Sequence, residues 1–133
     1  MGFSKAISAI YRKSNIHYDR ELRKLGLKSG MMMYIMCLCD NPGISQEEMA
    51  KDLMIDKSTV AKAIKQLVEE GYVLRSQSEV DNREYILQPS AKALKVYEQL
   101  NRTQEAWFQT LTAGMTEVER TLFLSLLDKI RVE

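Results

Sequence analysis

The sequence predicts a mainly α-helical protein with a small β-hairpin wing, in which a winged helix-turn-helix is flanked by helices at both ends of the chain. Apolar residues recur at three- and four-residue steps over most of the 133 residues. Two capped helical segments meet at a short turn near residue 55, and two β-rich runs enclose a polar tip near residue 80. This length and composition suit one cooperative unit with its own core.

The N-terminal part of the chain predicts two helices of different character. An amphipathic stripe from Phe3 to Leu25 predicts one helix that ends near Gly26. A second helix is predicted over roughly Ser29 to Cys39, and it is apolar almost all round, which is typical of a helix packed between neighbours. The run from Asp40 to Gly43 then ends it.

Two short helices with a three-residue turn between them are predicted in the centre of the chain. Ser45 and Glu48 match the S-x-x-E capping box, so one helix is expected to begin there and to end near Leu53. Asp56 is a good N-cap for the next helix, which Gly71 terminates. Such a pair of helices is a helix-turn-helix.

A hairpin and two further helices are predicted after the helix-turn-helix. The β-rich runs at residues 72–74 and 85–87 flank a polar stretch at 77–83, which indicates a hairpin. A long helix is predicted from Pro89 to Gly114, and a capping box that begins at Thr116 opens the last helix. The apolar stripe of this last helix consists of Leu122, Leu126 and Ile130.

Charge is distributed unevenly along the chain, although the net charge is only +1. Residues 1–43 hold seven Lys and Arg against three Asp and Glu, residues 44–88 hold six against nine, and residues 89–133 hold six of each. The central segment is therefore net acidic. Any DNA contact must come from a few well-placed cations, with the acidic residues turned away from the nucleic acid.

The helix-turn-helix predicts a DNA-binding surface, because this motif places its second helix in the major groove with the first turns nearest the base edges. Lysine donates to guanine or phosphate, and serine or threonine can reach a base or a phosphate. Lys65 and Gln66 lie further along the helix, where they can meet the DNA backbone. The alternative is an ordinary solvated helix face. The predicted DNA-binding residues are Ser45, Lys57, Ser58, Thr59, Lys62, Lys65, Gln66, Asp81 and Arg83.

Arg83 lies at the predicted wing tip, next to the turn formers Asp81 and Asn82. An arginine is attracted to a narrow minor groove by the enhanced negative potential of that groove. Asp81 could hold the guanidinium in position through a hydrogen-bonded ion pair. The alternative for this pair is a surface salt bridge, which contributes little to stability.

Two stretches of sequence carry a family resemblance. They are ISQEEMAKDLMIDKSTVAKAIKQLVEEGYVLRSQS at residues 44–78 and VDNREYILQPSAKAL at residues 80–94. In their order and spacing they resemble the MarR (multiple antibiotic resistance regulator) family of winged helix-turn-helix transcriptional regulators, and the D-x-R of the second stretch resembles the family's wing signature. The family usually continues from its wing strand with L-T-x-x-G. This chain has LQPSA at residues 87–91, which we expect to weaken the cap of the following helix.

The resemblance implies a homodimer built from the first helix and the last two, with a small-molecule pocket between the dimer base and the winged domain. Independently, residues 1–25 and 90–131 carry more apolar surface than one small winged core could cover. We therefore expect a single MarR-like domain over residues 1–133. Within it, residues 1–43 and 89–133 are expected to form the helical dimerisation region, and residues 44–88 the winged DNA-binding region.

The sequence offers few candidates for an effector pocket. The methionines at 31–33 with Tyr34 could line an adaptable pocket for an aromatic or lipophilic effector, although core packing is the alternative. A lone His17 cannot form a zinc site. Cys37 and Cys39 point to nearly opposite sides of one helix, where they are buried hydrophobes or, alternatively, redox or metal-binding groups. The candidate pocket residues are His17, Met33, Tyr34 and Cys37.

An enzyme is not expected, because the chain has one histidine, no nucleophile motif and no phosphate-binding glycine loop. We expect no cofactor, no metal, no membrane span and no signal peptide, and hence a cytoplasmic protein. The sequence predicts a homodimeric regulator that binds a pseudo-palindromic operator in double-stranded DNA, as a repressor released by a small-molecule ligand. The alternative is a winged-helix module that binds protein instead of DNA, which the acidic balance of residues 44–88 favours.

Overall fold

The computed structural model describes residues 1–28 and 30–132. Within this part of the chain, helices and a two-stranded antiparallel sheet follow one another in the predicted order, which confirms the mainly α-helical fold with a hairpin wing. The elements are α1 (Phe3–Lys24), α2 (Met32–Asp40), α3 (Gln46–Leu53), α4 (Lys57–Glu69), β1 (Val73–Gln77), β2 (Tyr85–Pro89), α5 (Ala91–Leu111) and α6 (Glu117–Leu127).

Several element boundaries differ from the sequence-based prediction by a few residues; the long helix, for example, ends at Leu111 and not at Gly114. The second helix begins at Met32 and not near Ser29, which lies outside the described residues. Gly30 has a φ of 83°, a left-handed conformation that an α-helix cannot contain. The last helix ends at Leu127, so Ile130 follows the helix and does not extend its stripe.

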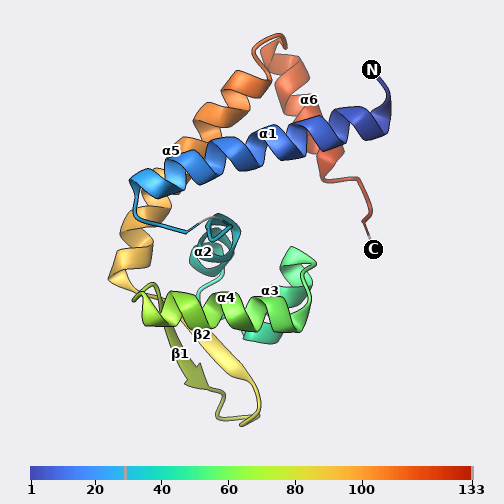
Figure 1. Cartoon of the computed structure of the whole chain (residues 1–133). Helices are drawn as coiled ribbons and strands as arrows, with labels where there is room; N and C mark the ends of the chain where they lie inside the picture. The colour runs from blue at the N-terminus through green and yellow to red at the C-terminus, as the bar shows by residue number, and fades with distance from the viewer. Residues whose placement is uncertain (29, 133) are drawn as a thin grey trace.

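The helices form an upper and a lower group on either side of α2 (Figure 1). In this view α1 and α6 lie above α2, α3, α4 and the hairpin lie below it, and α5 runs from the upper group down the left side past α2. The central helix packs against α5 on one side and against α3 and β2 on the other. It therefore connects the terminal helices to the helix-turn-helix and the wing.

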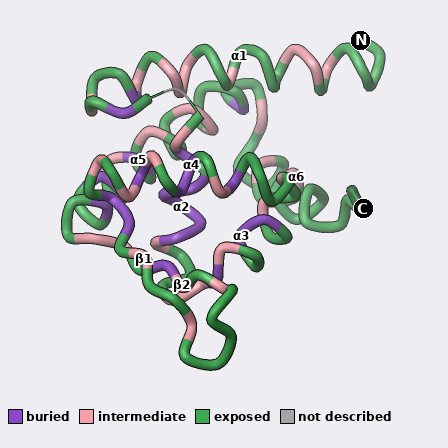
Figure 2. The backbone as a smooth tube through the Cα atoms, turned by 60° about the horizontal axis from the view of Figure 1, so that its bottom comes forward, coloured by how far each residue is buried: buried purple, intermediate pink, exposed green. Residues whose placement is uncertain are grey.

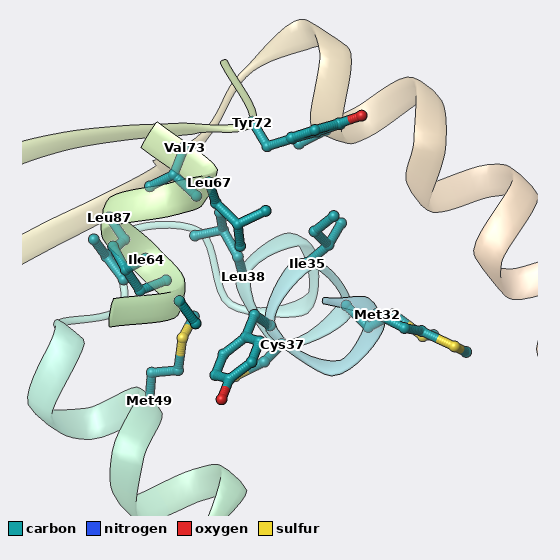
Figure 3. Close-up of a cluster of buried hydrophobic side chains, with 14 of the residues drawn as sticks. Met32, Ile35, Cys37, Leu38, Met49, Ile64, Leu67, Tyr72, Val73 and Leu87 are labelled. Carbon is teal, nitrogen blue, oxygen red and sulfur yellow. The ribbon is translucent and has the colours of Figure 1, made fainter. Parts of the chain in front are cut away.

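The hydrophobic core surrounds α2. Ile35 and Leu38 are fully buried there, as are Ile64 and Leu67 of α4 and Leu87 of β2 (Figure 3). Six of the nine residues of α2 are buried, as its all-round apolar character predicts. Burial of such side chains stabilises the fold by about 1.5–3 kcal/mol each.

Side-chain caps set the beginnings of the central helices. The Asp56 carboxylate accepts the Thr59 backbone N–H at 2.8 Å, and the Ser45 hydroxyl accepts the Glu48 backbone N–H at 3.0 Å. For α3 the structure contains only the serine half of the predicted capping box. The reciprocal arrangement is found at Thr116, where both bonds of the box are made.

The base of the wing is attached directly to the start of α3. The Gly43 backbone N–H donates to the Leu87 carbonyl at 2.8 Å, and the Leu87 N–H donates to the Ile44 carbonyl at 2.9 Å. Ser45 forms a β-bridge with Ile86. Because these backbone bonds join two ends of the winged segment, the hairpin is held in a fixed place beside the helix-turn-helix.

The cap of α5 is intact, which corrects the expectation that LQPSA at residues 87–91 would weaken it. The Ser90 hydroxyl accepts the Ala93 backbone N–H at 3.2 Å. The same hydroxyl donates to the Gly71 carbonyl at 2.6 Å, at the end of α4. Serine is as good an N-cap as threonine, and here it also joins α5 to the end of α4.

The terminal helices are much more exposed than the centre of the molecule (Figure 2). Leu22 is the only residue of α1 that is buried, and no residue of α6 is buried. Large apolar side chains are exposed on both helices: Phe3, Ile7, Ile10 and Tyr11 of α1, and Val118, Leu122, Leu124, Leu126 and Leu127 of α6. Among the described residues, no helix combines the length and hydropathy that a membrane crossing requires.

Candidate nucleic-acid interface

The second helix of the helix-turn-helix, α4, has one buried face and one polar face. Its buried residues are Val60, Ala63, Ile64 and Leu67. Ser58, Lys62 and Lys65 are exposed at i, i+4 and i+7, which places them together on the opposite side of the helix. The packing of α4 on the core therefore orients this predicted stripe toward solvent.

Asp56 organises the first turn of α4. One carboxylate oxygen accepts the Ser58 hydroxyl at 2.7 Å, and the other accepts the Thr59 hydroxyl at 2.8 Å. The Ser58 hydroxyl bond, followed by the two bonds from Thr59, lowers the pKa of Asp56 to about 2. This carboxylate is therefore ionised at neutral pH, and it holds the two predicted base-reading hydroxyls.

Lys57 is paired with an acidic residue of the preceding helix. Its ammonium lies 2.7 Å from the Glu47 carboxylate, and this hydrogen bond lowers the pKa of Glu47. Both side chains are largely exposed, so the pair contributes little to stability. Sequence reasoning missed this contact because the two residues are ten positions apart on different helices.

The remaining predicted residues of α4 have different surroundings. Lys62 and Lys65 are exposed, and neither forms a salt bridge within the part of the chain that the structure describes. Gln66 is half-buried and its amide donates to the Glu70 carboxylate at 3.4 Å. The two lysines are thus the cations of α4 with the greatest freedom to meet a phosphate or a base.

Ser45 differs from the other predicted DNA-binding residues because it is fully buried. Its hydroxyl caps α3, and its backbone bridges to β2. In this conformation the side chain has no route to a nucleic acid, so its contribution would be to hold α3 and the wing in register.

At the wing tip, Asp81 contacts both the backbone and the side chain of Arg83. One carboxylate oxygen of Asp81 accepts the Arg83 backbone N–H at 3.0 Å and lies 3.7 Å from its Nε. The Arg83 side chain is 94% exposed. The turn is therefore held by the aspartate, while most of the guanidinium remains available to a ligand.

Arg83 and Lys57 lie on the same face of the molecule. Together with Gln46, Glu47, Glu84 and Tyr85 they line a polar hollow of about 220 Å³ between α3, α4 and β2. A cation that sequence reasoning missed, Arg75 of β1, lies over the Tyr85 ring at 4.5 Å. The first residue of α4 and the wing tip thus present one cation each to the same hollow, which Glu47 and Glu84 also line.

The four candidate pocket residues do not share one cavity. Met33 lines a hollow of about 340 Å³ between α1, α2 and α5, together with Tyr18, Trp107 and Leu111. Tyr34 is 6% exposed and borders a different hollow of about 300 Å³, beside Thr59 and Lys62. Adjacent residues of a helix are turned by about 100°, which explains why Met33 and Tyr34 separate.

The other two candidates have packing roles. His17 stacks on Trp107 with ring centroids 4.4 Å apart, and the Trp107 indole donates to the Ser14 hydroxyl at 2.7 Å. The buried Cys37 thiol donates to the Asp52 carboxylate at 3.3 Å. Burial, and then this carboxylate, raise the pKa of Cys37 to about 12, while burial also raises the pKa of Cys39.

A helix-turn-helix with a polar recognition stripe and an antiparallel hairpin fixed beside it defines a winged helix-turn-helix protein. The model of the MarR family matches residues 27–85. The uncharacterised HTH-type transcriptional regulator YybA of Bacillus subtilis is 32% identical over 127 residues, which span 96% of this chain and 85% of that protein. The chain belongs to the MarR family of transcriptional regulators.

Two solved structures are similar over nearly the whole chain. A MarR transcriptional regulator from Methanosarcina mazei Go1 superposes with a TM-score of 0.89 at 33% identity, covering 94% of this chain and 90% of that one. A Listeria monocytogenes protein assigned to the same family, crystallised with a 26mer DNA, superposes with a TM-score of 0.90 at 28% identity. That match covers 97% of this chain and 86% of the other.

Proposed function

We propose that this protein is a homodimeric, sequence-specific regulator that binds a pseudo-palindromic operator in double-stranded DNA. The observation that carries the proposal is the exposed stripe of Ser58, Lys62 and Lys65 on α4, a helix whose first residue, Lys57, shares a hollow with the exposed Arg83. A recognition helix of this kind enters a major groove, and an arginine on a wing can enter the neighbouring minor groove. The Listeria relative that was crystallised with DNA supports the same use of the fold.

The dimer follows from the exposed apolar residues of the terminal helices. Phe3 and Ile7 of α1 and Leu122 and Leu126 of α6 are all about half exposed or more. A protomer that leaves this much apolar surface in water gains stability when a second copy covers it. We therefore assign residues 1–43 and 89–133 to the dimerisation region and residues 44–88 to the DNA-binding region.

A two-fold dimer presents two recognition helices, and its operator mirrors that symmetry with half-sites about 10 bp apart, roughly one turn of DNA. Repression would result from occupancy of a promoter by this dimer. We further propose that the protein acts in the cytoplasm, because a regulator must share a compartment with its operator.

Release by a small aromatic or lipophilic effector is the regulatory part of the proposal. The hollow of about 340 Å³ is mainly apolar and is bordered by Met33 of α2 and Trp107 of α5. A ligand between these helices would shift α2, which packs on α3, and so change the placement of the recognition helix. Because Trp107 is the chain's one tryptophan, its fluorescence reports directly on occupancy of the hollow.

A winged-helix module that binds protein remains the second candidate. It is favoured by the acidic residues near the recognition surface, above all Glu47 beside Lys57. A protein partner with basic residues would suit this surface better than a polyanion, because like charges oppose association.

Selection of bound sequences from a random duplex pool, followed by a salt titration, separates the two functions. We expect an inverted repeat, and a steep linear fall of log K with log salt because phosphate contacts release counterions. Random sequences with a flat salt dependence would instead support the protein-binding module. Selected sites without inverted symmetry would contradict the dimeric mode of reading.

A further inference from the structure

We propose that Asp56 fixes the hydrogen-bonding direction of the hydroxyls at the start of α4, so that Ser58 reads a base that offers an amino group, adenine or cytosine. The inference rests on the proposed function, since it names the class of base that the recognition surface would select.

One carboxylate accepts three hydrogen bonds at the start of α4. Asp56 accepts the Ser58 hydroxyl at 2.7 Å, the Thr59 hydroxyl at 2.8 Å and the Thr59 backbone N–H at 2.8 Å. An ionised carboxylate can only accept hydrogen bonds. Both hydroxyls must therefore act as donors toward Asp56, and their protons point back to the helix N-cap.

Each hydroxyl has a single proton and two lone pairs. Once that proton is committed to Asp56, the oxygen of Ser58 offers only lone pairs to a ligand. In the major groove the base groups that donate are the N6 amino group of adenine and the N4 amino group of cytosine. Guanine O6 and N7 and thymine O4 are acceptors, so they gain no hydrogen bond from a hydroxyl held in this direction.

The charge of Asp56 acts in the same sense. This carboxylate is exposed and lies at the end of the helix that approaches DNA. A negative charge next to the Ser58 and Thr59 hydroxyls repels the acceptor atoms of guanine, but it does not repel an amino group. Lys62, one turn further along the same face, has the opposite preference because an ammonium donates to guanine O6 and N7.

Of the two hydroxyl residues, Ser58 is the reader that the geometry favours. It shares the outward stripe with Lys62 and Lys65, opposite the buried face of α4. Thr59 is turned by about 100° from Ser58, toward the hollow that Tyr34 and Lys62 also line, so it lies at the edge of the stripe and not at its centre. The test is therefore built on Ser58, with Thr59 as the matched comparison on the same turn.

The first measurement is selection from a random duplex pool with the wild type and with Ser58→Ala. The operator position at which Ser58→Ala loses its base preference identifies the contacted base pair. We expect adenine or cytosine there on the contacted strand. Thermal melting of both proteins checks that the exposed substitution leaves the fold intact.

The second measurement replaces the contacted base by an analogue without its amino group, deoxynebularine for adenine or 2-pyrimidinone for cytosine. Wild-type affinity should fall about two- to tenfold, the effect of one hydrogen bond. The affinity of Ser58→Ala should not change with the same duplexes, which cancels any effect of the analogue on the DNA itself. Thr59→Val should respond to the analogue as the wild type does.

Asp56→Gly tests the cause of the preference, because it removes the acceptor of the Ser58 hydroxyl. Glycine is tolerated at an N-cap, so α4 should remain folded. The Ser58 proton is then free to face the DNA, and guanine or thymine should become acceptable at the contacted position. Asp56→Asn is the matched control: one oxygen of Asp56 accepts both the Ser58 hydroxyl and the Thr59 backbone N–H, and the amide oxygen of asparagine can do the same, so the preference should stay.

The outcomes separate this inference from the proposed function. Sequence-specific binding with guanine or thymine at the Ser58 position, or an equal analogue effect on wild type and Ser58→Ala, would overturn the inference and leave the regulator intact. The inference also fails if Ser58→Ala changes no operator position, or if Asp56→Gly leaves the preference unchanged. Loss of all sequence-specific binding by the wild type would overturn both.

Discussion

The winged centre and the terminal helices of this protein use their apolar residues in opposite ways. In the centre, Ile35, Leu38 and Ile64 are completely buried within the chain itself. In the terminal region α6 buries no residue, and Leu122 and Val118 are 54% and 78% exposed. Figure 2 shows the contrast between the buried interior and the exposed α1 and α6.

The difference indicates where the protomer is incomplete. The centre can keep its shape through its own packing, whereas α6 packs on α5 only in part, as where Phe123 stacks on Phe108, and leaves Leu122 and Leu126 about half exposed. An amphipathic helix gains most of its stability from packing of its apolar face. A second copy of the chain is the partner that our proposal supplies, and the following predictions test the contrast.

The largest effect is expected from charges on α6. Leu122→Glu combined with Leu126→Glu should convert a dimer to a monomer at micromolar concentration, because buried carboxylates without partners oppose association. Light scattering measures the mass. Val80→Glu is the matched control, since Val80 is an exposed apolar residue of the wing and its loss should leave the dimer unchanged. A dimeric double variant would show that α6 is not the interface.

A substitution in the central core should have the next largest effect. Leu38→Ala removes a fully buried side chain of α2 and should lower the free energy of unfolding by about 2–5 kcal/mol. Urea unfolding at fixed protein concentration provides the value. Met33→Ala on the same helix should cost much less, because Met33 is about half exposed. Equal losses at the two positions would contradict the contrast between buried and exposed faces.

Within the winged centre, Lys62→Ala tests the recognition stripe. If Lys62 contacts a base edge, affinity for the selected operator should fall by about 1–3 kcal/mol and the preference at one position should relax. Fluorescence anisotropy with operator and point-substituted duplexes measures both. A uniform loss over all sequences would instead assign Lys62 to a phosphate.

Arg83→Ala should have a smaller and different effect. Loss of one cation lowers the magnitude of the salt slope by about one unit, and affinity should fall most where the flanking minor groove is narrow. The protein should stay dimeric, because the wing lies far from α6 (Figure 1). An unchanged affinity and salt slope would mean that Asp81 and Arg83 form a surface salt bridge and nothing more.

The smallest effect concerns the buried thiol. The pKa of Cys37 is raised from 9.0 to about 12 in the folded protein. Between these two pH values the folded protein therefore keeps the thiol proton, whereas the unfolded chain loses it. This stabilisation is present below pH 9 and is lost as the pH rises toward 12. Cys37→Ala should therefore show a shallower loss of stability between pH 9 and 11, measured by urea unfolding. An identical pH dependence would contradict the pKa shift.

Much of the fold and part of the candidate site could be predicted from the sequence. The caps at Asp56 and Thr116 and the hairpin after Gly71 depend on residues a few positions apart, so their signals are local. The helix stripe of Lys62 and Lys65 follows from the period of the helix alone. The intact cap at Ser90 does not follow from the family pattern, whereas the chemistry of serine as an N-cap accounts for it.

What the sequence determined by itself was therefore the order, caps and polar faces of the elements, because these follow from hydrogen bonds and periodicity within a few residues. Tertiary structure alone decided which elements meet. It paired Glu47 with Lys57, buried Ser45 against the wing, and sent Met33 and Tyr34 to different hollows. Each outcome depends on how a helix is rotated about its axis, and that rotation is set by the packing of residues distant in the chain.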